Sequence, residues 1–417
     1  MQPVKLTILG DYIDCQIYRG RLYLWTFDGR IKVYKWYDLV NSLPKKDNDI
    51  IALKFCFLDG NYLYKNDLVD LFVDKEFKTI LLRKFTSVAE QSYQLTSKQA
   101  DKFLFGEQDT PQNILPTDTE IYSNKLYYIT EQGLFSSSAH RDNKKYPISS
   151  RPSKLWDCNL LSIKANKYPQ LALSGGSEGL FEFNLSNSDN NVWDRKDPNQ
   201  ISKGHSSFAN YTFWSIYNSS LVDKSYMALF SLNKSNEQEE PEDVFSFKSN
   251  YKREYKEIIN ESKIFKIGKN EKHLSWGVED KIYRATDFGF EIVKFNNKPK
   301  EDQGEKLFTP IQSVNLHPWK GKVIDGGTAY FGTIVECENA LVVMLSNGEF
   351  VTIEGPITRW RVYPRSLNYE NQLHVIKDDR IEIYSFNQDY FLNQDEKILG
   401  IQHKQPRQWG QGVRPSL

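Results

Sequence analysis

Two short segments carry an aspartate at the same position, and paired carboxylates can perform acid–base chemistry. Residues 13–17 (IDCQI) resemble residues 156–160 (WDCNL), so Asp14 and Asp157 occupy equivalent places. If these segments are equivalent strands around a common centre, the two carboxylates face each other across it. Carboxylates held roughly 5–10 Å apart serve as acid and base in glycoside hydrolysis. In the other interpretation, each aspartate accepts hydrogen bonds from backbone N–H groups and has a structural role.

A basic and aromatic run, TRWRVYPR, spans residues 358–365. Side chains alternate along an extended strand, so Arg359 and Arg361 share one face and Trp360 lies on the other. Arginine beside aromatic rings is typical of protein-binding hot spots and of platforms for single-stranded nucleic acid. A structural interpretation instead pairs these arginines with Asp14 or Asp157. The candidate binding residues of this run are Arg359, Trp360, Arg361, Tyr363 and Arg365.

The C-terminal segment, residues 401–417, has little with which to pack against itself. We expect it to be flexible unless it docks. Its candidate binding residues are Arg407, Trp409 and Arg414. They suit insertion into a groove of a partner, and they suit equally a return across the face of their own domain.

Recognisable metal and cofactor motifs do not occur in the sequence. The six histidines form no HExxH pattern, and the four cysteines form no CxxC pair. The glycine-rich stretch 174–179 (SGGSEG) lacks the lysine of a phosphate-binding loop and is followed by alternating strand-like residues, which predicts a turn between strands. We therefore expect no cofactor and no metal site.

A hairpin pattern recurs along the chain and supplies the elements that must position these residues. An acidic or amide residue near a glycine, between two alternating runs, is a strong signal of a β-hairpin. Five such copies occur at residues 26–34, 129–135, 177–183, 287–293 and 346–351, and a sixth at 378–384 matches the first but has Asp in place of the glycine. The second and third copies lie 46 positions apart, near the roughly 40–45 residues of a propeller blade. Two gaps of about twice that length predict further, degenerate copies at 74–82 and 225–232.

Hairpins at this spacing resemble those of β-propeller repeat proteins. The resemblance implies an all-β fold, a single β-propeller over residues 1–400 with about seven four-stranded blades, or eight. Polar insertions are expected near 91–116, 184–207 and 233–262, the last with a short helix, and 401–417 forms a tail. Segments such as 13–17, 156–160 and 359–362 are expected to be first strands that face the central channel. No Gly-His…Trp-Asp signature repeats in register, so the resemblance transfers no functional residue.

A rival architecture, two β-sandwich domains divided near residue 200, has the same strand content. The close match between the first and last hairpins, FDGRIKVY and KDDRIEIY, favours a ring that closes on itself. Closure removes exposed strand edges.

Composition narrows the functional classes. The 54 basic residues equal the 54 acidic ones, so the chain lacks the net basic footprint typical of nucleic-acid-binding domains. This balance does not exclude a local basic patch. No run is apolar enough to cross a membrane and no signal peptide is evident, so we expect a cytoplasmic protein without a membrane partner.

Three hypotheses follow. The first is a non-catalytic scaffold or complex subunit that binds another protein through propeller-face loops and the tail. The second is a propeller hydrolase acting on a sugar or small ester, with Asp14 and Asp157 as its catalytic pair. The third is nucleic-acid or nucleotide recognition through Arg359–Arg365.

Overall fold

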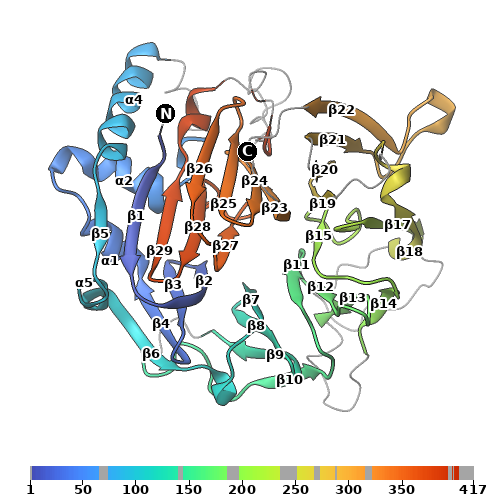
Figure 1. Ribbon diagram of the computed structural model, residues 1–417, viewed down its shortest axis with the longest axis horizontal. Coiled ribbons are helices and arrows are strands. Elements are labelled where there is room, and N and C mark those ends of the chain that lie inside the picture. Colours follow the sequence, from blue (N-terminus) through green and yellow to red (C-terminus); the bar gives the residue numbers. More distant parts are fainter. Residues whose placement is uncertain are drawn as a thin grey trace, which may run out of the picture.

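The computed structural model contains seven sheets, antiparallel except for one parallel pair in the seventh, arranged as blades around a central channel (Figure 1). It describes residues 2–64, 74–139, 144–185, 197–234, 251–266, 273–286, 289–314, 322–392, 397 and 399–402. The innermost strands of neighbouring blades contact one another around the ring, and the strand of the seventh blade contacts that of the first. The chain is a seven-bladed β-propeller.

The blades follow one another along the sequence, and the strands of each blade are ordered outward from an innermost strand. The first blade consists of β2 (Tyr12–Tyr18), β3 (Arg21–Thr26), β4 (Arg30–Lys35) and β6 (Leu104–Asp109). The second consists of β7 (Asp118–Tyr122), β8 (Lys125–Thr130), β9 (Gly133–Ser138) and β10 (Ser153–Trp156). The third consists of β11 (Ser162–Ala165), β12 (Gln170–Ser174), β13 (Leu180–Asn184) and β14 (Asn199–Ser202). The fourth and fifth are β15 (Ala209–Tyr211), β16 (Leu221–Asp223), β17 (Tyr226–Lys234) and β18 (Tyr251–Asn260); and β19 (His273–Val278), β20 (Lys281–Thr286), β21 (Phe290–Phe295) and β22 (Phe308–Val314). The last two are β23 (Val323–Ala329), β24 (Gly332–Cys337), β25 (Ala340–Leu345) and β26 (Phe350–Glu354); and β27 (Arg359–Val362), β28 (Gln372–Lys377), β29 (Arg380–Ser385), β1 (Val4–Leu9) and β5 (Tyr93–Leu95).

The predicted hairpins form the middle of six blades. They connect β3 to β4, β8 to β9, β12 to β13, β20 to β21, β25 to β26 and β28 to β29. Gly29 and Gly348 have positive φ angles of 84° and 88°, which glycine adopts without steric cost. The degenerate copy predicted at 225–232 lies in β17, so the fourth blade is also present. The prediction of a propeller of about seven blades is confirmed.

The copy predicted at 74–82 is wrong, because this segment is helical. Asp74 caps α4 (Lys75–Ala89) by accepting hydrogen bonds from the N–H groups of Glu76 and Phe77. Leu81, Phe85 and Val88 are the buried residues of α4, at the spacing of one helical face. The long gap between the first two hairpins therefore holds an insertion between β4 and β6 and no hidden blade.

This helical insertion packs on the outside of the ring beside β1 and β5 (Figure 1). Its other elements are α1 (Trp36–Asn41), η1 (Asp47–Asp49), α2 (Ile50–Phe57), η2 (Tyr62–Tyr64), α5 (Ser97–Ala100) and η4 (Asp101–Phe103). The Phe85 ring stacks on Tyr390 with their centroids 6.0 Å apart, and it meets Phe391 edge-on. The insertion therefore shares its core with the end of the described chain.

The seventh blade draws strands from three parts of the sequence. The N-terminal strand β1 pairs antiparallel with β29, with Leu6 opposite Ile383. On its other edge β1 pairs parallel with β5, with Leu6 opposite Tyr93. The ring is therefore closed by the N-terminus, and β5 of the insertion covers the edge of the closing strand.

The stretches expected to be polar insertions contain blade strands as well. Residues 91–116 include β5, β6 and the 3-10 helix η5 (Pro111–Asn113), and 184–207 include β14. Within 233–262, residues 251–260 form β18, so the short helix expected there is a strand. The remaining 3-10 helices are η7 (Glu261–Lys263), η8 (Glu301–Gln303) and η9 (Gln388–Phe391). Across the described residues, no helix combines the length and the hydropathy that a membrane span requires.

Candidate functional site

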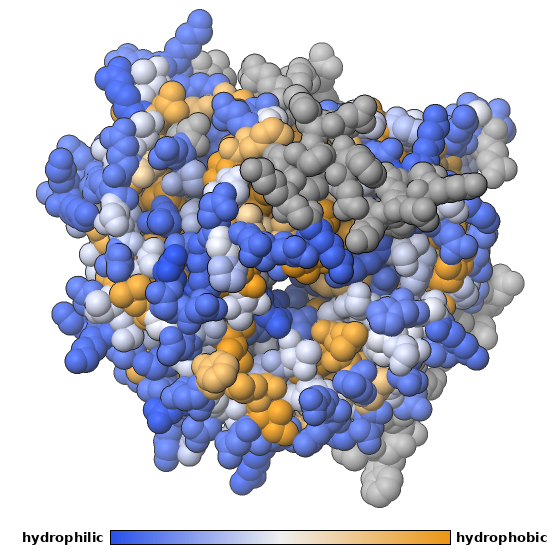
Figure 2. Space-filling view, viewed as in Figure 1, coloured by the Kyte–Doolittle hydropathy of each residue, from blue (hydrophilic) through white to orange (hydrophobic). Residues whose placement is uncertain are grey.

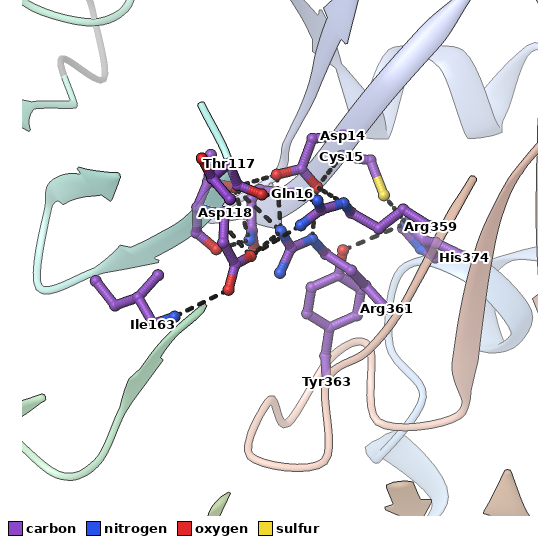
Figure 3. A network of polar contacts seen from close by, with 11 residues as sticks. Asp14, Cys15, Gln16, Thr117, Asp118, Ile163, Arg359, Arg361, Tyr363 and His374 are labelled. Atoms are coloured by element: carbon purple, nitrogen blue, oxygen red, sulfur yellow. Dashed lines mark hydrogen bonds and ion pairs between the residues drawn. The ribbon is translucent and has the colours of Figure 1, made fainter. Parts of the chain in front are cut away.

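Arg361 lies at the centre of a cluster of charges on the innermost strands (Figure 3). Its Nε and Nη2 atoms donate to Asp14 Oδ1 and Oδ2, both at 2.7 Å. The same Nη2 donates to Asp118 Oδ1 at 2.8 Å. A planar guanidinium matches a carboxylate in this two-bond geometry, which is stronger than a pair of neutral hydrogen bonds. β27 thus reaches both the first and the second blade.

The Asp14 carboxylate is fully occupied within the protein. Besides the two bonds from Arg361, its oxygens accept from the Cys15 N–H at 2.8 Å and from Thr119 Oγ1 at 2.7 Å, and the residue is 1% exposed. Burial by itself raises the pKa of Asp14, but the charges of Arg361 and Arg359 outweigh it and hold the pKa below its usual range. Asp14 is a permanently ionised structural carboxylate.

Asp118 performs a similar role on the second blade. Its Oδ1 accepts from Arg359 Nη1 at 3.0 Å as well as from Arg361, and its Oδ2 accepts from the Ile163 N–H at 3.0 Å. One carboxylate thereby connects the seventh, second and third blades. Burial lowers the pKa of Arg361, but the charges of Asp14 and Asp118 dominate and raise it well above its ordinary value.

Asp157 is not part of this cluster, and the prediction that it faces the channel is wrong. It follows β10, the outermost strand of its blade, where its side chain is 85% exposed and pairs with Lys154 Nζ at 2.9 Å. Asp118 occupies the position expected of Asp157. The structural interpretation of the arginines therefore holds for Asp14, with Asp118 in place of Asp157.

The remaining residues of the basic run lie around the cluster. Trp360 Nε1 donates to Glu336 Oε2 at 2.8 Å, which joins the seventh blade to the sixth. The Tyr363 hydroxyl lies 3.4 Å from His374 Nδ1, and His374 Nε2 lies 3.0 Å from Gln372 Oε1. Burial, aided by the charge of Arg361, lowers the pKa of His374 to about 3, so this imidazole is neutral.

A cavity of about 740 Å³ occupies the channel beside this cluster. It is lined by residues of the innermost strands, including Glu120, Lys164, Asn210 and Trp276. Figure 2 shows an opening at the centre of the ring with hydrophilic side chains in its depth. The volume lies within the roughly 300–1,000 Å³ range of small-molecule sites.

Arg365 lies across one end of this cavity. Its Nη1 donates to the Ala165 carbonyl oxygen at 2.5 Å, and its guanidinium carbon lies 5.8 Å from the centroid of the Trp214 ring. The side chain therefore spans from the seventh blade to the third and fourth. Burial lowers the pKa of Arg365, although nearby groups such as Glu120 act in the opposite direction.

The loop that carries Trp214, residues 213–220, is held from several sides. Hydrogen bonds to its backbone carbonyls come from Asn166 Nδ2 to Ser215 at 2.9 Å, Gln170 Nε2 to Ile216 at 3.1 Å, Asn297 Nδ2 to Asn218 at 2.9 Å and Arg253 Nε to Ser219 at 2.8 Å. These donors belong to the third, fourth and fifth blades. Trp214 nevertheless remains 43% exposed, so an aromatic side chain is displayed on a fixed backbone.

One further sequence feature has a plain structural setting. Residues 175–179 (GGSEG) have the spacing of a serine-hydrolase nucleophile elbow, but they join β12 to β13, whereas that motif requires a strand-to-helix turn. The predicted tail residues Arg407, Trp409 and Arg414 lie outside the described residues.

Comparisons with known proteins give structural neighbours of low sequence identity. A scan against protein-family models finds no match, and a search of curated proteins finds no relative. Among solved structures, the WD40 domain of Toxoplasma gondii coronin is 7% identical, with a TM-score of 0.47 over 95% of this chain and 89% of that one. BBS1N, solved in complex with ARL6DN, is 9% identical, with a TM-score of 0.46 over 92% of this chain and 98% of that one. The AfRom2 CNH domain is 13% identical, with a TM-score of 0.35 over 65% of this chain and 94% of that one.

Proposed function

We propose that this propeller is a non-catalytic binding platform for another protein. The observation that carries the proposal is the fixed loop 213–220, which displays Trp214 and Tyr217 to solvent. Aromatic side chains on an ordered backbone are typical of interface hot spots, because little conformational entropy is lost when they bind.

The surroundings of this loop extend the same surface. Each innermost strand turns into its neighbour on one face of the ring, and we name this the inner-turn face. Tyr168 follows β11 on this face, and Leu367, which is 69% exposed, follows β27. Together with Arg365, these residues give an apolar and aromatic surface around a basic side chain, the composition that protein interfaces favour. The inner-turn face of the proposal consists of Tyr168, Trp214, Tyr217, Arg365 and Leu367.

The contacts of the central charges weigh against the other two hypotheses. A hydrolase would need a carboxylate free to exchange protons with a substrate, whereas the oxygens of Asp14 already accept four hydrogen bonds. Nucleic-acid recognition would need Arg359 and Arg361 to face phosphates, whereas both donate to Asp118. Arg365 is the residue of the basic run that we retain for partner binding, with the C-terminal tail as a second contact.

The test is affinity purification of the tagged full chain from its native host, from the cytoplasmic fraction where we place it, followed by mass spectrometry. The recovered partner is then purified, and its binding to the propeller is measured directly. The double variant W214A/L367S should weaken binding at least tenfold. The matched control is F27S, since Phe27 is 73% exposed on the β3–β4 turn of the opposite face. Absence of a stoichiometric partner, or a partner that distinguishes neither variant from wild type, would refute the proposal.

A further inference from the structure

Among the polar side chains that line the cavity, three lie on neighbouring innermost strands. Glu120 lies on β7, Lys164 on β11 and Asn210 on β15. Within the part of the chain that the structure describes, none of these three side chains takes part in a hydrogen bond or an ion pair. They contrast with Asp14, Asp118 and Arg361 nearby, which are bonded to one another. The second, third and fourth blades therefore form a polar half-ring, Glu120–Lys164–Asn210, whose bonding capacity is unused.

An unused charge inside a cavity is energetically costly. Removing a carboxylate or an ammonium group from water carries a large penalty unless a partner compensates it. Glu120 is partly buried, and burial raises its pKa against the opposing charges of Lys164 and Arg361. Glu120 and Lys164 have opposite charges on adjacent strands, yet they do not form an ion pair within 4.0 Å. A ligand with both charges would compensate each of them at once.

The wall formed by the fifth, sixth and seventh blades is different in character. Gly326 and Gly327 on β23 lie against the indole rings of Trp276 and Trp360, and all four residues line the cavity. A Cβ atom at Gly327 would lie 2.8 Å from the Trp360 ring, so a side chain there would displace the indole. The two glycines thus leave room for the rings. Trp276 is buried whereas Trp360 is partly exposed, so the aromatic surface that this wall offers to a bound group belongs to Trp360.

We infer that the cavity binds a compact zwitterion of the α-amino-acid class with an apolar side chain. The Glu120 carboxylate accepts hydrogen bonds from the ammonium group of the ligand, while Lys164 and the Asn210 amide donate hydrogen bonds to its carboxylate. The apolar side chain of the ligand then packs toward Trp360. A ligand with a single charge would bond to only one of the two charged side chains, Glu120 or Lys164. Trp214, Arg365 and Leu367 of the inner-turn face also line this cavity, but the bonds proposed here are made by Glu120, Lys164 and Asn210, so the two proposals rest on different residues.

The test is isothermal titration calorimetry of the full chain with L-phenylalanine. Two analogues, phenethylamine and 3-phenylpropionate, retain only the ammonium or only the carboxylate, and each should bind at least tenfold more weakly. The variants E120Q and K164M should each weaken L-phenylalanine binding at least tenfold. The control K154M removes a lysine that pairs with Asp157 on the outer edge of the second blade and should bind as wild type does.

The inference is overturned if L-phenylalanine, L-leucine and L-tryptophan give no heat of binding at millimolar concentration. It is equally overturned if a single-charge analogue binds as tightly as the amino acid, or if folded E120Q and K164M bind like wild type. The analogue comparison uses only the wild-type chain, so it decides the question even if a variant misfolds. E120Q should retain binding to the protein partner, because Glu120 lies outside the inner-turn face, and this separates a failure of this site from a failure of the protein-docking proposal.

Discussion

Arg361 and Asp14 are 347 residues apart in sequence and form two hydrogen bonds of 2.7 Å between the last and the first blade. The ring is therefore joined twice at the same seam. β1 pairs with β29 toward the outside, and Arg361 bonds to Asp14 at the channel. The seam is held by backbone pairing of β1 with β29 on the outer side of the ring and by the ion pair of Arg361 with Asp14 beside the channel.

Replacing Arg361 by methionine should destabilise the fold by about 3–5 kcal/mol, because the variant removes both Arg361 bonds from the buried carboxylate of Asp14 and leaves it only the more distant charge of Arg359, at 3.9 Å. Urea denaturation at neutral pH measures the loss. R30M is the control, since Arg30 forms an exposed pair with Glu107. The double variant R361M/D14N should recover part of the stability. A loss in R361M no greater than that in R30M would contradict the structural role of the pair.

His374 should make the protein less stable in acid. Its pKa in the fold is lowered to about 3, whereas an unfolded histidine has a pKa of about 6.5. Between these values the unfolded chain binds the additional proton, so the free energy of unfolding falls as the pH falls, by up to about 1.4 kcal/mol per pH unit. H374Q removes this contribution, and urea titrations at several pH values from 6.5 down to 4 should show a flatter profile. The exposed residue His205 supplies the control, H205Q, whose profile should match that of wild type.

Glu370 should have the opposite effect, because it should make the protein less stable as the pH rises. Burial, with help from the charge of Asp389, raises its pKa to about 8, although the hydrogen bond from Asn61 opposes the shift. The folded protein holds this proton where an unfolded glutamate, with a pKa near 4.3, has lost it. Stability is therefore lost as the pH rises from about 4.5 to 8. In E370Q that loss should disappear, while E257Q, at an exposed glutamate of β18, should follow wild type.

The helical insertion should depend on its buried face. F85A removes a fully buried ring that packs on Tyr390 and Phe391, so it should cost about 3–5 kcal/mol. Hydrogen exchange should accelerate in α4 and β1 and remain slow in the third to fifth blades. I80A, on the exposed face of the same helix, should change stability by less than about 0.5 kcal/mol. Equal effects of the two variants would show that the insertion does not share its core with the ring.

The fold was predictable because its hairpins are local. An acidic or amide residue near a glycine, between alternating runs, needs no distant partner to be recognised, and such turns, in one case with Asp379 in place of the glycine, mark six of the seven blades. The prediction for residues 74–82 was wrong because nine residues are too few to distinguish the periodicity of a helix from that of a strand. Only the longer pattern of Leu81, Phe85 and Val88, together with the Asp74 cap, identifies the helix.

Only half of the candidate site could be predicted from the sequence. The alternation of Arg359 and Arg361 on a first strand, and their pairing with Asp14, could be read from the sequence. The sequence could not identify Asp118, instead of Asp157, as the partner of the arginines, because similar short sequence segments occur on innermost and outermost strands. The signal that favours Asp118 is its place in Asp118–Tyr122, the strand that precedes the second hairpin. The half-ring of Glu120, Lys164 and Asn210 had no local signal, because it exists only when three blades lie side by side.

The pairing of β1 with β29 also determines when the protein can be completed during its synthesis. The strand VKLTIL is synthesised long before its partner β29, which ends at Ser385. At about 5–20 residues per second, β1 waits on the order of 20–75 s for that partner. The strand β5 can cover one edge of β1 earlier, but the edge that pairs with β29 stays unsatisfied throughout this interval, which is the condition under which nascent chains aggregate or recruit chaperones. Slow translation of any segment between β1 and β29 would lengthen this exposure and lower the yield of folded protein.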